Sequence, residues 1–166
     1  GALAMGMRRL SVIDLEGGWQ PLYSADGQVV VFQNGEMYNY RELRAELQRN
    51  GFVFRTNSDT EVVAHGYVAW GIDGLLQRVD GMFAYAILDK RSGELHLARD
   101  RFGEKPLFYA AGDGRFAWAS NLLALASLPW VDIDSDPQAL DDYLAVHYVG
   151  GPRTFFRGVR RLLPGH

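Results

Sequence analysis

The first third of the chain alternates between a hydrophobic run and an amphipathic segment. The run Gln28–Gln33 is rich in β-branched and aromatic residues, which predicts a buried strand. Leu43 and Leu47 stand four positions apart, and this spacing predicts a helix over Tyr40–Asn50 with Asn39 as its N-cap. The chain therefore begins with strand and helix in succession.

A second pair of elements follows with the same kind of signal. Phe52–Thr56 is predicted as a short strand. Ser58–Glu61 has the residues of a capping box, in which a hydroxyl and a carboxylate satisfy amides at a helix start. The helix is expected to reach about Trp70, because Gly71 follows.

The second half of the pattern predicts hairpins. Met82–Leu88 and Glu94–Arg99 are predicted as two long strands, joined by Lys90–Gly93. A second predicted hairpin pairs Leu107–Ala110 with Arg115–Ala119. Adjacent hairpins give antiparallel sheets that helices must cover, so the predicted fold class is α+β.

One further helix is expected near the end of the sequence. Asp136 is followed by Pro137, a cap and first-turn pair that predicts a helix to about Val146. The last residues, Leu163–His166, stop where a turn would begin, and the first residues resemble a strand already under way. We therefore expect one domain over residues 1–166 that is truncated at both ends.

Composition narrows the class of protein. The chain has 166 residues, of which 48% are hydrophobic and 22% charged, enough for one substantial core. The net charge is −3 without a concentrated basic stripe, so no nucleic-acid partner is predicted. No run of about 18 apolar residues and no secretory pattern occur. The default expectation is a cytoplasmic protein without a membrane anchor.

Cysteine and histidine usage limits the chemistry. The chain contains no cysteine, which excludes disulfides, thiolate metal sites and a cysteine nucleophile within these residues. Its four histidines are widely spaced and form no metal-binding motif. No metal site or cofactor is therefore expected in this domain.

Asn34-Gly35-Glu36, directly after the first predicted strand, is the leading candidate for a site. Asn-Gly is a common hairpin turn, and on local chemistry alone this structural interpretation is the more frequent one. The functional alternative is that the Asn34 amide and the Gly35 backbone N–H stabilise a developing oxyanion. Glu36 would then accept from a substrate ammonium group.

Two other places offer charged groups for the same ligand. Asp59 in the first helical turn is favoured by the helix dipole, but it is also placed to hold a cation. The Arg8-Arg9 pair is typical of a solvated strand edge, yet one guanidinium can clamp a carboxylate. A cation donor, two carboxylates and an oxyanion hole together match an α-amino acid with a side-chain amide, and glutamine has that chemistry.

An ordered series of motifs along nearly the whole chain resembles a known family, the glutaminase domain of glutamine-hydrolysing asparagine synthetases. These are class II amidotransferases with an N-terminal nucleophile. The matching segments are Arg9–Leu15, Gln20–Leu22, Asn34–Tyr40, Ser58–Val62, Gly81–Ala84, Ala98–Gly103, Lys105–Leu107, Tyr143-Leu144, Pro152–Thr154 and Leu163–His166.

The resemblance implies a four-layer αββα sandwich of two antiparallel sheets, of the Ntn-hydrolase type. It implies that Arg9 binds the glutamine carboxylate, that Asn34 and Gly35 form the oxyanion hole, and that Glu36 and Asp59 bind the α-amino group. In this family the nucleophile is an N-terminal cysteine whose α-amino group serves as base. Ammonia then passes to a separate synthetase domain, where ATP and Mg are expected.

Several family features are absent from these residues. The Met-Cys-Gly opening and the His-Arg-Gly-Pro-Asp stretch do not occur, so these residues alone are predicted to be inactive. Gln33 stands where the family more often has phenylalanine, and Gly150-Gly151 where a proline is commoner.

Three functional hypotheses remain open at this point. The first is the glutaminase half of an asparagine synthetase-like enzyme, with the synthetase domain as partner. The second is an inactive scaffold or docking domain, and the third is an amidotransferase with a non-aspartate acceptor. An unpaired sheet edge left by a missing first strand would also favour a homodimer or poor solubility.

Overall fold

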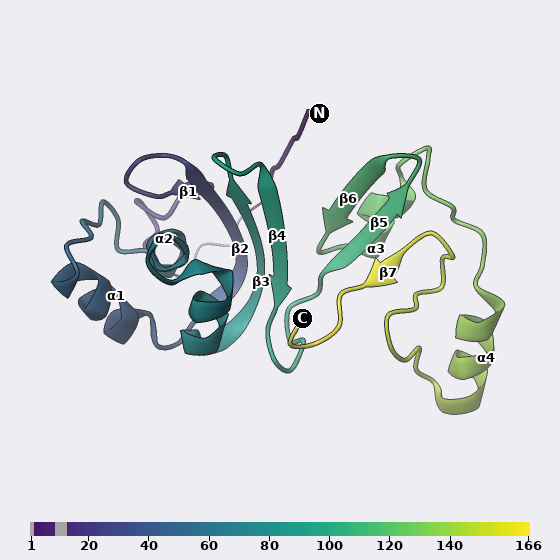
Figure 1. Cartoon of the computed structure of the whole chain (residues 1–166). Helices are drawn as coiled ribbons and strands as arrows, with labels where there is room; N and C mark the ends of the chain where they lie inside the picture. Colours follow the sequence, from purple (N-terminus) through teal and green to yellow (C-terminus); the bar gives the residue numbers. More distant parts are fainter. Residues whose placement is uncertain (1, 9–12) are drawn as a thin grey trace. The chain divides into compact units, whose positions relative to one another are not determined.

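The computed structural model describes residues 2–8 and 13–166 (Figure 1). The chain divides into two compact units, residues 1–98 and 99–166, and each is described by itself. Both units contain an antiparallel sheet with helices, which confirms the predicted α+β class of two antiparallel sheets. The four-layer order of the sandwich stays a prediction.

The first unit is built on a sheet of four strands. They follow the order β1-β2-β3-β4, with β1 at Leu22–Tyr23, β2 at Val29–Met37, β3 at Gly81–Asp89 and β4 at Glu94–Arg99. The predicted hairpin between β3 and β4 is confirmed, and Gly93 N donates to Asp89 O in its turn at 2.8 Å. The short β1 was not predicted.

The prediction that the first strand ends before Asn34 is wrong. β2 continues to Met37, and its last residues pair with the start of β3, with Asn34 opposite Ala84 and Gly35 opposite Phe83. Asn34-Gly35 therefore lies inside a strand and does not form a hairpin turn. The long partner strand overrides the local turn preference of the dipeptide.

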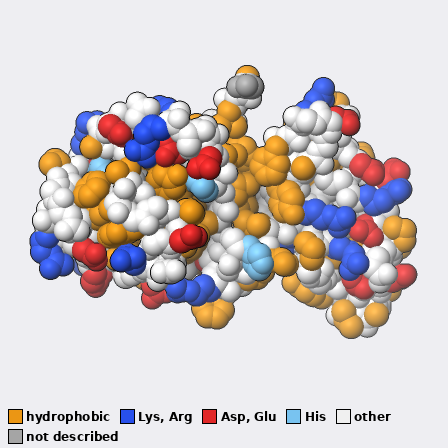
Figure 2. Space-filling view, in the orientation of Figure 1, with side chains coloured by type: hydrophobic (Ala, Val, Ile, Leu, Met, Phe, Trp, Pro, Cys, Tyr) orange, Lys and Arg blue, Asp and Glu red, His pale blue; other side chains and the backbone are white. Residues whose placement is uncertain are grey.

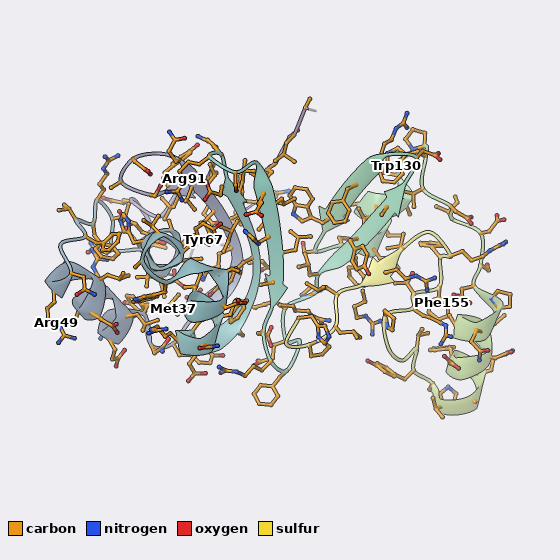
Figure 3. The ribbon with its side chains drawn as sticks, viewed as in Figure 1. Met37, Arg49, Tyr67, Arg91, Trp130 and Phe155 are labelled. Atoms are coloured by element: carbon orange, nitrogen blue, oxygen red, sulfur yellow. The ribbon has the colours of Figure 1, made fainter. Side chains whose placement is uncertain are left out.

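Two helices cover one face of this sheet, as Figure 1 shows. α1 spans Tyr40–Arg49 and packs against α2, which spans Asp59–Arg78 and packs against β2 and β1. Gly71 has a φ of 69° and interrupts the helical conformation, so the predicted stop is real, but the helix resumes after it. Figure 3 labels Met37 on the side of β2 that faces the helices.

The core of the first unit fills the space between the helices and the sheet. Alternate residues of β2 point into it, since successive side chains of a strand face opposite sides. Its buried members include Val29, Val31, Met37, Leu47, Val62, Val63, Leu75, Phe83, Tyr85 and Ile87. Gln33 shares their side of β2 and is the polar exception in that row.

Asn39 precedes α1, but its side chain does not cap that helix as predicted. Its Nδ2 donates to Arg78 O at 2.8 Å, and its Oδ1 accepts from Asp80 N at 3.0 Å. Asn39 thus joins the start of α1 to the end of α2 and the turn into β3.

We expect Asn39→Ala to destabilise the first unit by about 1 kcal/mol, because two backbone groups lose a partner that water can replace. Thermal unfolding of the purified protein measures this. Asn50→Ala is the matched control, because Asn50 is exposed at the other end of α1 and its side chain bonds no described residue. Equal effects of the two substitutions would contradict the bridging role.

The predicted strand over Phe52–Thr56 is wrong. The segment is irregular, and the amides of Arg55 and Thr56 donate to the carboxylate of Glu61 at 2.8 Å each. A side chain thus satisfies the donors that a neighbouring strand would otherwise take.

The second unit has a sheet of three strands, ordered β6-β5-β7. β5 spans Phe108–Gly112, β6 spans Arg115–Ala119 and β7 spans Arg160–Arg161. The predicted hairpin between β5 and β6 is confirmed, whereas β7 was not foreseen.

Two helices belong to the same unit. α3, at Leu122–Ala126, was not predicted and packs against β5 and β6. α4 spans Pro137–Val146, and Asp136 caps it by accepting from Gln138 N at 3.0 Å, as predicted. Figure 3 labels Trp130 and Phe155 in this unit.

A buried arginine fixes the loop before β5. The guanidinium of Arg99 donates to Lys105 O, Leu162 O and Gly103 O at 2.7, 2.7 and 2.5 Å. Burial and the nearby Arg161 lower the pKa of Arg99, but the three carbonyls supply the acceptors that a buried guanidinium requires. Arg99 therefore has a structural role.

Within the described part of the chain, no helix is long and apolar enough to cross a membrane. The same residues contain no group of three or more histidine, aspartate or glutamate side chains that could hold a metal ion. Figure 2 shows hydrophobic side chains interspersed with charged ones on the face that it presents.

Candidate functional site

The strand β2 carries three of the predicted site residues in succession. Asn34 and Glu36 are two positions apart in β2, and both are half-buried. The Asn34 amide makes no hydrogen bond to any other residue that the structure describes. This arrangement is compatible with an amide that serves a ligand.

Gly35 is held close to the neighbouring strand. Its φ is 126°, a conformation that L side chains rarely adopt. An added Cβ would overlap Met82 O and lie 2.9 Å from Phe83 Cα, both backbone atoms of β3. The position therefore requires glycine.

Asp59, the first residue of α2, is docked against this part of β2. Its Oδ2 accepts from Met37 N at 2.9 Å and from the Gln33 side-chain Nε2 at 2.6 Å. The residue is only 4% exposed. The structure thus brings Asp59 to the strand segment that holds Asn34, Gly35 and Glu36, although the two lie 22 or more residues apart in sequence.

The two oxygens of the Asp59 carboxylate are not equivalent. Oδ2 receives two strong internal donors, which fill its two lone pairs. Oδ1 accepts from Thr60 N at 3.0 Å and, through a long hydrogen bond of 3.5 Å, from Ser58 Oγ. Thr60 N also donates to Ser58 Oγ at 3.2 Å and is thereby shared. Oδ1 is the oxygen with capacity for a further donor.

Gln33 joins the strand to the helix start. Its Nε2 donates to Asp59 Oδ2 and, at 3.1 Å, to Gly35 O. Its backbone is in turn held by the Gln20 side chain, whose Oε1 accepts from Gln33 N at 2.6 Å and whose Nε2 donates to Gln33 O at 3.0 Å. The two glutamines fix the strand on either side of the candidate site.

Glu61 organises the loop that leads into α2. Besides the two backbone amides, its Oε2 accepts from Thr56 Oγ1 at 2.7 Å. Burial alone would raise the pKa of Glu61, but the nearby His65 ring and the donors of Arg55 and Thr56 outweigh it and lower the pKa to about 2. The carboxylate therefore stays charged while it holds the loop.

The predicted capping box forms only in part. Ser58 caps the helix through Thr60 N, as expected, but Glu61 does not return to the Ser58 amide, which donates to Thr56 Oγ1 at 3.2 Å instead. Glu61 reaches further back along the chain because Arg55 and Thr56 offer it three donors.

His65 lies one helical turn after Glu61 and is 1% exposed. Its Nε2 is 3.4 Å from Glu61 Oε1, and its ring packs against Phe52 and Phe54 at centroid distances of 5.4 and 4.7 Å. His65 Nε2 has no hydrogen-bond partner among the described residues, so its contact with Glu61 is electrostatic. His65 therefore supports the loop through its contacts with Glu61, Phe52 and Phe54.

Arg9, the predicted partner of the glutamine carboxylate, lies outside the described residues. The structure therefore joins Asp59 to the strand of Asn34, Gly35 and Glu36. The role of Arg9 stays a prediction. Sequence reasoning missed the contributions of Gln20 and Gln33. The signal that could have found Gln33 was a polar residue in the inward-facing row of an otherwise apolar strand.

Comparison with known proteins matches residues 1–166 to the glutamine amidotransferase domain. The chain belongs to this family.

The relatives of this amidotransferase domain include a Mycobacterium tuberculosis protein named among the asparagine synthetases (glutamine-hydrolyzing). It is 47% identical over 174 residues, which cover 99% of this chain and 26% of the relative. An asparagine synthetase (glutamine-hydrolyzing) of Bacillus subtilis is 39% identical over 163 residues, which cover 98% and 26%. The chain spans about a quarter of the length of these relatives. The resemblance inferred from the motifs is thus confirmed.

A solved structure supports the fold of the amidotransferase domain. Glutamine phosphoribosylpyrophosphate amidotransferase from Bacillus subtilis matches 64% of this chain and 25% of its own, with a TM-score of 0.56 and 28% identity. The predicted fold class therefore agrees with the structure of another amidotransferase.

Proposed function

We propose that these residues form the glutamine-binding half of an asparagine synthetase-like amidotransferase. The observation that carries the proposal is the docking of Asp59 onto the β2 segment that bears Asn34 and Gly35. The docking supports the proposal, because the buried Asp59 carboxylate contacts the strand that contains Asn34 and Gly35. The names of the relatives at 47% and 39% identity support glutamine as the substrate.

The proposed reaction breaks the side-chain amide of glutamine. A nucleophile adds to the amide carbon, and the Asn34 amide with the Gly35 N–H stabilises the oxyanion that develops. The C–N bond then breaks and ammonia leaves, after which water releases glutamate. Glu36 and Asp59 hold the α-ammonium group, and Arg9 the α-carboxylate.

The nucleophile is proposed to be a cysteine of the longer natural protein, because the 166 residues contain none. Ammonia would pass to a synthetase domain that uses ATP and Mg to activate an acceptor. The names of the relatives favour aspartate as that acceptor.

The decisive experiment treats the full-length natural protein with a glutamine-derived electrophile and maps the labelled residue by mass spectrometry. We expect label on an N-terminal cysteine, protection of that cysteine by glutamine, and release of ammonia from glutamine. Absence of both label and ammonia would reject the proposal and favour the scaffold hypothesis, which the lack of cysteine motivates. Acceptor identity is then tested by adding aspartate and ATP and measuring asparagine.

A further inference from the structure

The side-chain amide of Gln33 has one orientation that satisfies its surroundings. Its Nε2 lies 2.6 Å from Asp59 Oδ2 and 3.1 Å from Gly35 O, and both of these atoms are acceptors. Exchanging the amide oxygen and nitrogen would place an oxygen against both. The two acceptors therefore fix the position of the other amide atom, Oε1.

Oε1 of Gln33 is buried and has no hydrogen-bond partner among the residues that the structure describes. The residue is 2% exposed. A buried polar atom without a partner is unfavourable, so such an atom in a folded protein needs an explanation. A donor that binds there would supply one.

The chemistry of that donor follows from the neighbouring atoms. Oε1 and Nε2 share one carbon, so Oε1 lies within a few ångströms of the Asp59 carboxylate. Asp59 Oδ1, at the start of the twenty-residue helix α2, also has capacity for another donor. An ammonium group has three donors and no acceptor, so it suits a neutral acceptor near a charged one.

We infer that Gln33 is a further substrate-recognition residue, whose Oε1 accepts a hydrogen bond from the α-ammonium group of glutamine beside Asp59 Oδ1. The inference rests on the proposed function, since it assumes that glutamine binds here. It assigns a role to a residue that departs from the phenylalanine more usual in the family. Burial strengthens the interaction, because a low local dielectric favours charge-assisted hydrogen bonds.

The test uses the full-length natural protein with Gln33→Met, which removes both polar atoms and keeps the side-chain length. Gln48→Met on the exposed face of α1 is the matched control. Each protein is assayed for kcat/KM and for equilibrium Kd with L-glutamine and with the analogue that has hydrogen in place of the α-ammonium group.

We expect Gln33→Met to lower kcat/KM and to raise Kd for L-glutamine, each by about 10- to 100-fold, as for loss of a hydrogen bond to a charged group. For the analogue, which lacks the α-ammonium group, kcat/KM and Kd should change by less than about 3-fold, within the range of substitutions that leave a contact intact. Gln48→Met should change neither. An equal loss for both compounds, or none for either, overturns the inference, because Oε1 would then have a structural role or bind water.

A second variant separates direct contact from an effect through Asp59. When Gln33→Met is added to Asp59→Asn, a direct contact predicts a further loss of at least about 5-fold for L-glutamine. No further loss would show that Gln33 acts only through Asp59, which overturns the direct contact. The proposed function fails separately, if wild-type protein releases no ammonia. The Kd comparison still decides the role of Gln33 in that case, and absence of glutamine binding overturns both proposals.

Discussion

Gly35→Ala is expected to prevent stable folding of the first unit. The new Cβ would overlap Met82 O, and the φ of 126° disfavours any side chain at this position. Neither strand can move aside easily, because Gly35 is paired with Phe83 inside the β2–β3 ladder, with further pairs on both sides. Steric overlap and backbone strain together should cost about 3–5 kcal/mol, a large part of the stability of a small domain.

Gly27→Ala is the matched control for this prediction. Gly27 also has a positive φ, 68°, but an added Cβ would meet no atom within 4 Å. It should therefore show backbone strain alone, about 1–2 kcal/mol. The measurements are soluble yield, thermal unfolding and hydrogen exchange over residues 34–38. Similar stability of the two variants would contradict the close approach of the strands.

Glu61→Gln is expected to have the second-largest effect. The carboxylate accepts from Arg55 N, Thr56 N and Thr56 Oγ1, and it contacts His65. A carboxamide presents an NH₂ group to donors that need an acceptor, so the loop loses part of its support. We expect a cost of about 2–4 kcal/mol at neutral pH and fast hydrogen exchange over residues 52–58. Glu42→Gln on exposed α1 is the control and should change little.

The effect of Glu61→Gln should depend on pH. The folded protein lowers the pKa of Glu61 from 4.5 to about 2. The carboxylate therefore stabilises the fold fully above pH ~4.5, and this contribution is lost as the pH falls towards ~2. The difference in stability between wild type and variant should shrink over that interval. A difference that is constant from pH 7 to pH 3 would show that the carboxylate charge does not hold the loop.

Local patterns were sufficient to predict the hairpins and the starts of α1, α2 and α4, whereas α3 was not predicted. The β3–β4 hairpin and the Asp136 cap depend on residues close in sequence, so their chemistry is visible in the chain. β2 was cut short because the pairing of Asn34–Met37 depends on β3, about fifty residues away. The irregular course of residues 52–56 likewise depends on Glu61, whose side chain replaces a partner strand.

The candidate site was predictable as a set of residue types but not as a geometry. The choice of Asn34, Gly35, Glu36 and Asp59 came from chemistry and family motifs, and the structure shows that Asp59 docks on that strand. The internal use of Asp59 Oδ2 could not be foreseen, because it requires the Gln33 side chain to cross from sheet to helix. Sequence gives the charge of a carboxylate, whereas the fold decides which of its oxygens is available.

The Gln20 side chain serves as a substitute for one residue of a strand. β1 pairs Leu22 with Val31, and continuing that register places Pro21 opposite Phe32 and Gln20 opposite Gln33. Proline has no N–H for a ladder, so backbone pairing stops there. The Gln20 amide then offers Gln33 one donor and one acceptor, as a peptide group would. A strand from another molecule could pair with Gln33 only after it displaced this amide. A single side chain thus hinders pairing of another strand at the sheet edge beside Asn34.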